Sequence, residues 1–210
     1  MPYPGRDANY GSYPTIALET TGPAAMFARP DTGATPISYP IPTYSAAKGM
    51  FEAIVWRSSV YIHPTHVDIC KPIRYERYIT NYGGPLRKPA QIKGNNNYQL
   101  IATILVDVHY RIYAEVKEKK RSGQRKMDYA EEFKREFERR LENGQTFYTP
   151  CLGWKEFVPS YVGPLRAGTK PDENIDMIIP SLLHSMWERH KLQPTFRQDV
   201  EVKAGVMFYE

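Results

Sequence analysis

Several classes of protein are excluded by what this sequence lacks. Its 210 residues include two cysteines, Cys70 and Cys151, too few for a disulfide framework or a cysteine-built zinc site. No apolar run approaches the roughly 18 residues that a membrane span requires, and no apolar stretch follows the N-terminus as in a signal peptide. We therefore expect a cytoplasmic protein that does not contact a membrane.

Motifs for common cofactors are also missing. The chain has no glycine-rich dinucleotide loop, no P-loop, no zinc-protease helix and no pair of cysteines two residues apart. His63 and His66 flank Pro64 at a spacing that suits a metal pair, but ordinary strand positions explain them better. We therefore expect no metal and no cofactor.

The positive charge is concentrated in one segment. Lys and Arg number 28 against 23 acidic residues, a formal net charge of +5. Residues Lys117–Lys126 hold six basic residues and one acidic residue, so this segment alone carries the excess. Aromatic residues make up 13% of the chain, and many tyrosines lie beside arginine. The pattern favours a polyanion such as single-stranded RNA, although a solvated hairpin tip explains the charge equally well.

The apolar spacing predicts two helices. The first begins after an N-cap at Thr43 and continues to Trp56. The second opens at Asp128, with Glu131 as its capping-box partner, and ends at Asn143-Gly144. Both helices have an apolar stripe on one side, so each is expected to pack on a sheet.

The longest periodic segment is a strand, Leu100–Val116. Apolar residues occupy its even positions, and most of its odd positions are polar, which gives one core face and one polar face. Further strands are expected at Thr15–Thr20, Val60–Cys70, Lys71–Thr80 and Val200–Tyr209. We interpret residues 1–14 as an arm, 21–42 and 81–97 as loops, 147–162 as a strand with turns, and 175–190 as mixed.

The order strand, helix, strand, strand, helix, strand indicates the α+β class. It is the βαββαβ order of ferredoxin-like folds, which RNA-recognition modules share. We expect a ferredoxin-like (RRM-like) RNA-binding domain with its N-terminal arm over residues 1–146. Residues 147–210 are expected to form an elaborated C-terminal β-rich appendage.

Blocks of sequence, in order along the chain, resemble one family. They are Phe27–Pro30, Ser38–Gly49 with Glu52–Trp56, Lys71–Ile73, Val106–Tyr110, Arg139–Gln145 and Pro150–Phe157. The chain is similar to the fifth CRISPR-associated (Cas-five) family of the RAMP superfamily, nearest its subtype I-C branch. The resemblance covers roughly residues 15–165 and weakens after that.

The resemblance implies a function in prokaryotic antiviral defence. Members of the family grip the 5′ handle of a CRISPR RNA (crRNA) and cap the foot of the Cascade surveillance complex. Their partners are the large subunit, the backbone subunits and, indirectly, target DNA. In subtype I-C the same protein is also a metal-independent endoribonuclease that trims the precursor RNA by attack of a 2′-hydroxyl on the adjacent phosphate.

The sequence departs from that family at the catalytic positions. The I-C set is an aromatic residue, typically tyrosine, just before the tryptophan of the first helix, together with a Lys-His pair entering the second helix. Aligning on Trp56 places Val55 at the aromatic position, and counting back from the Arg139–Gln145 block places Glu132 and Phe133 at the Lys-His pair. None of the three offers equivalent chemistry, so the catalytic residues stay unknown.

Two functions remain open. The first is a non-catalytic subunit that holds the crRNA handle, with these RNA-binding residues: Arg29, Tyr39, Lys48, Arg125 and Lys126. The second is an active endoribonuclease with a replacement set drawn from His109, Tyr98 or Lys126. An RNA-binding protein outside CRISPR systems is a third interpretation.

Overall fold

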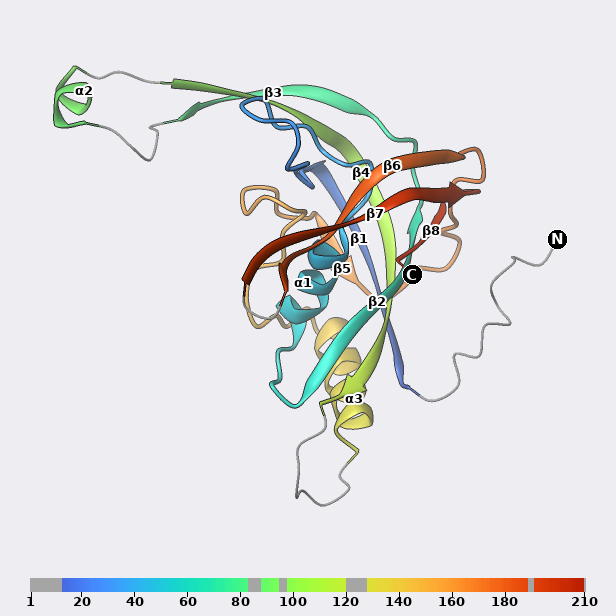
Figure 1. Ribbon diagram of the computed structural model, residues 1–210. Helices are drawn as coiled ribbons and strands as arrows, with labels where there is room; N and C mark the ends of the chain where they lie inside the picture. Colours follow the sequence, from blue (N-terminus) through green and yellow to red (C-terminus); the bar gives the residue numbers. More distant parts are fainter. Residues whose placement is uncertain (1–12, 83–87, 95–97, 120–127, 189–190, 210) are drawn as a thin grey trace.

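The computed structural model describes residues 13–82, 88–94, 98–119, 128–188 and 191–209. It is a mixed α/β structure in which a curled antiparallel sheet of eight strands is accompanied by few helices (Figure 1). The α+β class expected from the sequence is therefore confirmed. The predicted N-terminal arm, residues 1–14, lies almost entirely outside the described residues.

The central strands alternate with the two long helices along the chain. Their bounds are β1 Thr15–Ala25, α1 Tyr44–Ile54, β2 Val60–Ile69, β4 Tyr98–Glu118, α3 Tyr129–Glu142 and β5 Tyr161–Gly163. In space the order is β5–β1–β4–β2, and every neighbouring pair is antiparallel. Both helix starts follow the predicted capping, because Thr43 accepts from the N–H of Ala46 and Asp128 accepts from that of Glu131.

Strand β4 is long enough to pair with different strands along its two halves. Its first half pairs with β3 (Tyr75–Tyr82), and the two form a hairpin that leaves the body, with the short helix α2 (Pro89–Lys93) beyond its end (Figure 1). Its second half pairs with both β1 and β2. Asp107, with φ 52°, lies where β4 passes from one pairing to the other, in a backbone region that is unfavourable for a residue other than glycine.

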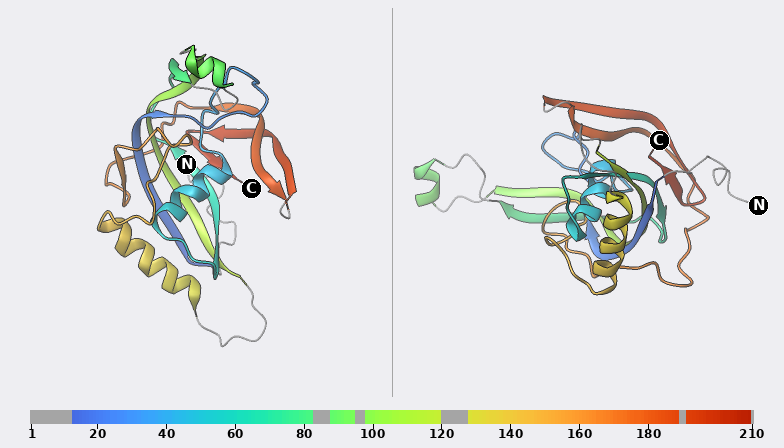
Figure 2. Two further views of the ribbon diagram at one scale, coloured as in Figure 1. Left: turned by 90° about the vertical axis from the view of Figure 1, so that its left-hand side faces the viewer. Right: turned by 90° about the horizontal axis from the view of Figure 1, so that it is seen from below.

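The C-terminal strands extend the same sheet. β6 (Met177–Glu188) and β7 (Lys191–Lys203) form a hairpin, and β8 (Val206–Phe208) joins it to β2. Two further views show the hairpin curving away from the central strands (Figure 2). The sheet therefore runs without a break from β5 to β6.

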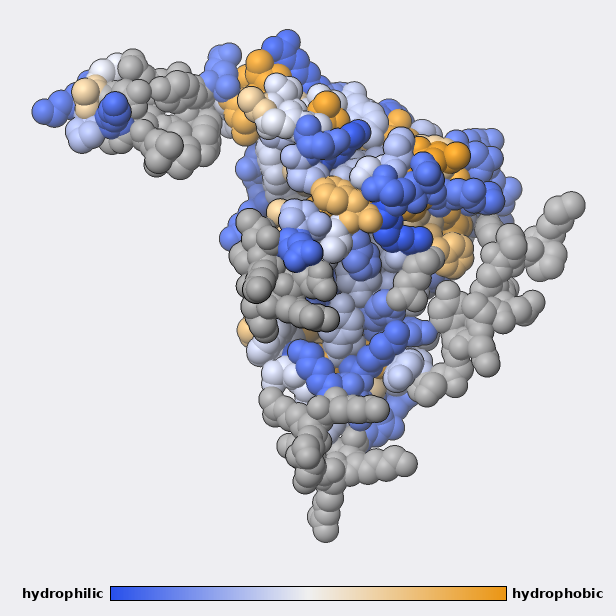
Figure 3. Space-filling model, in the orientation of Figure 1, coloured by the Kyte–Doolittle hydropathy of each residue, from blue (hydrophilic) through white to orange (hydrophobic). Residues whose placement is uncertain are grey.

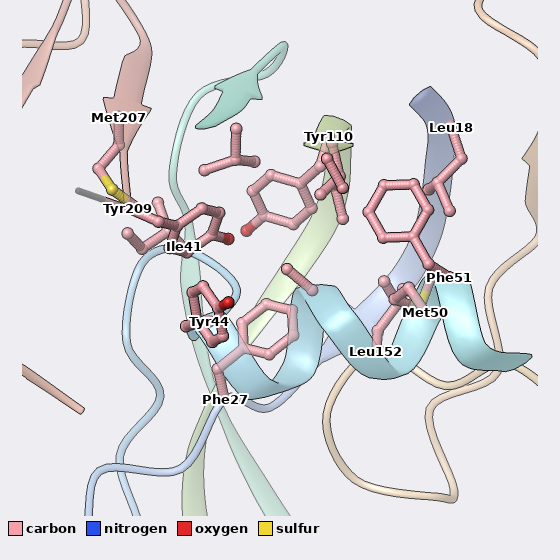
Figure 4. Packing of buried hydrophobic residues seen from close by; sticks show 14 of the residues in the cluster. Leu18, Phe27, Ile41, Tyr44, Met50, Phe51, Tyr110, Leu152, Met207 and Tyr209 are labelled. Carbon is pink, nitrogen blue, oxygen red and sulfur yellow. The ribbon is translucent and has the colours of Figure 1, made fainter. Parts of the chain in front are cut away.

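The core lies between the sheet and the helices α1 and α3. The rings of Phe51 on α1 and Phe137 on α3 are 5.6 Å apart, and both side chains are fully buried. Figure 4 shows the end of this core at α1, where Tyr44 packs beside Tyr209 and Tyr110 packs beside Phe27. The even positions of β4 face this core, as the alternation predicts.

Several predicted boundaries need correction. Residues 21–25 continue β1 instead of starting a loop, since Pro23 leaves the pairing with β4 on either side of it intact. The expected loop 81–97 contains α2, and the expected strand over 147–162 shrinks to β5, because hydrogen bonds tie residues 147–157 to neighbouring loops and to α1 instead of to a strand. The mixed segment 175–190 is mainly the long strand β6.

None of the helices in the described part of the chain is long and apolar enough to cross a membrane. Large hydrophobic residues do lie on the surface, as single residues or small groups. Ile79 on β3, Ile178 on β6 and Phe196 on β7 are examples. The space-filling view shows such hydrophobic residues as small patches on a largely hydrophilic face (Figure 3).

Candidate RNA-binding surface

Two of the predicted RNA-binding residues lie together at the loop between β1 and α1. The Arg29 guanidinium donates to both carboxylate oxygens of Asp31, at 2.7 and 3.1 Å, and lies 5.7 Å from the centre of the Tyr39 ring. Tyr39 is only 2% exposed, and its hydroxyl accepts a hydrogen bond from the N–H of Leu183 on β6. Arg29 is thus available to solvent, whereas the Tyr39 ring is part of the core.

Lys48 lies on α1, partly exposed. Its ammonium is 3.4 Å from the carboxylate of Glu52, one turn along, and 4.7 Å from the centre of the Tyr61 ring. Tyr61 is bonded through its hydroxyl to Tyr44, whose hydroxyl is in turn 2.7 Å from Nδ1 of His63. The other two predicted residues, Arg125 and Lys126, lie outside the described residues.

Val55, Glu132 and Phe133, which the resemblance matches to a catalytic set, have structural roles here. Val55 and Phe133 are buried at 2% and 0% exposure, on the side of the sheet covered by α1 and α3. Glu132 accepts from Arg57 at 2.9 Å, and Arg57 also pairs with Glu136. An apolar side chain cannot move a proton, and this carboxylate is held by a cation, so these three residues provide no acid–base pair.

The opposite side of the sheet holds the densest group of polar side chains. Its centre is Glu19 on β1, which has no exposed surface. Oε1 accepts from Nε2 of His109 at 2.9 Å, from Nε of Arg166 at 2.6 Å and from Oγ1 of Thr169 at 3.1 Å. Oε2 accepts from Nε of Arg111 at 3.1 Å and from the backbone N–H of Arg166 at 2.9 Å. We call these five residues the Glu19 cluster.

The sheet register brings the Glu19 cluster together. Glu19 pairs with Arg111 across β1 and β4, and Thr21 pairs with His109 two residues further on. The odd positions of both strands therefore share the face away from the helices. Arg166 and Thr169 come from the segment after β5, which folds back over that face.

The environment of Glu19 keeps its carboxylate ionised. Burial alone acts to raise its pKa, but the hydrogen bonds from Arg166, His109 and Arg111 outweigh burial and lower the pKa to about 2. Because the carboxylate can only accept, Nε2 of His109 is the protonated ring nitrogen that donates to it. The histidine is thereby fixed in one tautomer and one orientation.

A neighbouring carboxyl group behaves in the opposite way. Asp68 on β2 pairs with Arg111 across β4 and accepts from the Tyr113 hydroxyl at 3.2 Å. Burial raises its pKa to about 6, although the hydrogen bond from Tyr113 and the charge of Arg111 act to lower it. Burial also raises the pKa of the adjacent Cys70 thiol to about 12, so Cys70 is no nucleophile at neutral pH.

A hollow of about 760 Å³ opens beside the Glu19 cluster. Its lining includes Cys70, His109 and the chain from Arg166 to Asp172. The hollow is shallow and wide open to solvent, which suits one nucleotide of a longer chain better than an enclosed small molecule. Within the described residues, no group of acidic, histidine or cysteine side chains has the arrangement of a metal site.

The sequence pattern points to part of this surface. It identified His109 and the polar face of β4, but it missed Glu19, Arg111, Arg166 and Thr169. Glu19 occupies an odd position of an alternating strand, which gave no sign that the position is covered. Arg166 is 147 residues away in sequence, and only the folded chain brings it to Glu19.

The fold and this surface together define a class of protein: a curled antiparallel sheet with two helices on one side and a polar cluster on the other. A solved structure titled as that of a CRISPR-associated protein aligns with a TM-score of 0.72 and 18% identity over 95% of both chains. A functionally uncharacterized protein from Streptococcus mutans aligns with a TM-score of 0.71 and 16% identity, covering 94% of this chain and 93% of that one. These likenesses concern the fold alone.

Sequence comparison then identifies the family. The model of the family described as CRISPR-associated protein (Cas_Cas5), in its Cas5d form, matches residues 15–208. The chain belongs to this CRISPR-associated Cas5 family, which confirms the resemblance found in the sequence.

Two relatives carry a functional name, "CRISPR pre-crRNA endoribonuclease Cas5d". The protein of Mannheimia succiniciproducens is 28% identical over 91% of this chain and 93% of its own length. That of Thermus thermophilus is 29% identical over 81% of this chain and 72% of its own length. A chain from a structure titled "CRISPR RNA-guided surveillance complex" aligns with a TM-score of 0.55 and 15% identity, covering 92% of this chain and 91% of that one.

Proposed function

We propose that this protein is the subunit of a type I Cascade complex that binds and caps the 5′ handle of the crRNA. The observation that carries the proposal is the family match over residues 15–208, with relatives named for their action on pre-crRNA. Its partners are then crRNA, the large subunit and the backbone subunits, with target DNA contacted indirectly. Cascade acts on nucleic acid in the prokaryotic cytoplasm, so we assign the protein to that compartment.

The strand order supports the finer fold assignment. β1 lies between β5 and β4, and β4 lies between β1 and β2, so each helix joins two strands that are parallel to each other and not adjacent. This order is consistent with the split βαβ arrangement of a ferredoxin-like unit and supports that assignment. We assign residues 1–146 to that RNA-binding unit, which β5 completes, and residues 147–210 to the C-terminal β-rich appendage.

Arg29 and Lys48 are the predicted residues best placed to contact phosphate. Each is partly exposed, and each is paired with a carboxylate at the surface, an interaction worth little in water. An RNA phosphate can replace Asp31 or Glu52 at small cost. Tyr39 contributes to RNA binding indirectly, because its buried ring and its hydrogen bond from Leu183 hold the segment that carries Arg29. Arg125 and Lys126 remain assigned to phosphate on the charge of their segment.

The test is binding of purified protein to repeat-derived RNA and to a shuffled RNA of equal length at about 150 mM salt. Specific recognition predicts a clear preference for the repeat sequence. The charge-reversed variants Arg29→Glu and Lys48→Glu are expected to weaken binding about tenfold, while the Lys134→Glu control on α3 is expected to have a small effect. Equal affinity for the two RNAs would refute the proposal.

A second function, metal-independent cleavage of pre-crRNA, is favoured by one observation. Of the three replacement residues, Lys126 lies outside the described residues and the side chain of Tyr98 is not described, whereas His109 is held by an ionised carboxylate at 2.9 Å. A histidine oriented by a carboxylate is the usual partner for moving a proton. In such a reaction the 2′-oxygen bonds to phosphorus, its proton passes to a base, and the 5′-oxygen leaves with a proton.

Cleavage is tested by incubating the protein with repeat RNA and EDTA. The activity would be established if the wild type formed products ending in a 2′,3′-cyclic phosphate and the His109→Gln variant formed none. Tight binding without products in the wild type would leave the protein as a holder of the handle alone.

A further inference from the structure

The segment after β5 contains two cations, Arg166 and Lys170, whose charged groups reach the surface. Arg166 binds Glu19 through Nε, and within the described residues it pairs with no other carboxylate. Its side chain is 46% exposed, and apart from a 3.4 Å contact between Nη2 and Nε2 of His109 its Nη groups face the surface. Lys170 is exposed, lines the hollow beside Arg166, and forms no ion pair with any of the described residues.

Arg166 is fixed before any ligand arrives. Glu19 accepts both its backbone N–H and its Nε, and the guanidinium lies 4.2 Å from the centre of the Tyr161 ring. Arginine otherwise loses considerable side-chain entropy when it binds an anion, so a guanidinium held on a buried carboxylate binds at lower cost. The planar group presents paired N–H donors that match phosphate geometry.

The charge around the hollow also favours an anion. Among the residues that line the hollow, Arg166 and Lys170 are cations and Asp172 is the acidic residue, while Arg111 behind them lies between the carboxylates of Glu19 and Asp68. Glu19 is already saturated by five donors, and Oδ1 of Asp172 accepts from the backbone and side-chain amides of Asn174. The lining of the open hollow therefore carries a small net positive charge.

We propose that this hollow binds a phosphate group of single-stranded RNA, with Arg166 and Lys170 as the direct contacts and His109 beside them. The inference rests on the proposed RNA-binding function and adds a site from the chain after residue 163. It places the phosphate next to a histidine of fixed tautomer, on the face of the sheet away from α1 and α3.

The first arm of the test measures RNA affinity against salt. Each phosphate contact to a single strand contributes about 0.7 to the slope of log K against log salt. Lys170→Ala is therefore expected to lower affinity about fivefold and to reduce the slope by about 0.7, without changing thermal stability. Lys170→Glu should weaken binding further. Lys134→Ala, at a partly exposed lysine on α3 that lies 4.0 Å from Glu138, is the control and should leave the slope unchanged.

The second arm separates phosphate from general charge. Inorganic phosphate should compete with the RNA more strongly than sodium chloride of equal ionic strength, and Lys170→Glu should lose that difference. If wild-type protein prefers repeat RNA but Lys170→Ala and Lys170→Glu match it in affinity and slope, the site is refuted and the proposed function stands. If the wild type shows no preference for repeat RNA, the proposed function itself fails.

Arg166→Lys tests the fixed guanidinium. The substitution keeps the charge but loses the paired donors and the bond from Nε to Glu19. We expect it to weaken RNA binding more than Lys170→Ala does. Because it also touches the Glu19 cluster, its unfolding midpoint must be measured alongside, and the effect on RNA must exceed any loss of folded protein. Wild-type affinity in a well-folded Arg166→Lys variant would contradict the assignment.

Discussion

The two sides of the sheet use their residues differently. On the side covered by α1 and α3, Val55 and Phe133 lie in the apolar core, and Glu132 is tied to Arg57. On the other side, Glu19 is buried among hydrogen-bond donors, and an open hollow lies beside them. The three positions that the resemblance matches to a catalytic set therefore carry side chains with structural roles in this chain.

On the polar side, a buried carboxylate and its donors hold one another in place. A buried carboxylate is stable only if donors satisfy it, and the donors that satisfy Glu19 are themselves fixed by it. The apolar side needs no such arrangement, since hydrophobic packing alone stabilises Phe133. Substitutions on each side of the sheet test this difference.

The largest effect is expected from Glu19→Ala. The substitution leaves Arg111, Arg166 and His109 without their common acceptor, and we expect a loss of about 3–5 kcal/mol in the free energy of unfolding. Urea unfolding at pH 7 measures it. The control Glu52→Ala removes a surface carboxylate paired with Lys48 and should cost less than about 1 kcal/mol. Equal losses in the two variants would contradict the distinction between the faces.

On the helix side, Phe133→His should destabilise without creating a ribonuclease. The ring has no exposed surface, so an imidazole there leaves a polar group buried in the core, and we expect a loss of about 3 kcal/mol. The control Phe133→Leu should cost less because it stays apolar. Urea unfolding and an RNA cleavage assay in EDTA check both points, and a stable variant that gains cleavage would show that this face is catalytic.

Asp68→Asn should have a smaller effect of opposite sign. Burial raises the pKa of Asp68 from 3.8 to about 6, so the folded protein binds the proton more tightly, and stability falls as pH rises from about 4 to 6. Asparagine does not ionise, so Asp68→Asn should raise the free energy of unfolding by about 1–2 kcal/mol at pH 7. Unfolding in urea from pH 4 to 7 measures the difference between variant and wild type.

Glu19 gives the reverse pH dependence on the same face. Its pKa of about 2 lies below the ordinary value of 4.5, so its contribution is present above about pH 5 and is lost as pH falls toward 2. A wild-type stability that did not fall in acid relative to Glu19→Gln would contradict the hydrogen bonding described here.

The smallest effect is expected from Gly49→Ala on α1. A Cβ at Gly49 would have no neighbour within 4 Å, and glycine in a helix costs about 0.5–1 kcal/mol relative to alanine. The melting temperature should rise by about 2–4 °C. The control Gly153→Ala should be severely destabilised, since φ is 88° and the Cβ would fall 1.9 Å from the Met26 carbonyl oxygen.

The sequence predicted the elements whose signals are local. The caps at Thr43 and Asp128 and the alternation of β4 depend on neighbouring residues, and all three are found in the structure. It failed where contacts are distant, as in residues 147–160, which are held by hydrogen bonds to α1 and to neighbouring loops and form no long strand. Of the Glu19 cluster, His109 was a candidate from the sequence, whereas its partners come from distant segments that the local pattern does not connect.

The most direct test of the account is ultraviolet crosslinking of repeat RNA to the unaltered protein, with the crosslinked peptides mapped by mass spectrometry. We predict crosslinks in the segment 161–172 and in the part of β4 that carries His109. Crosslinks confined to the helix side, with none on the face that carries the Glu19 cluster, would contradict the claim that RNA also contacts the side of the sheet away from the helices.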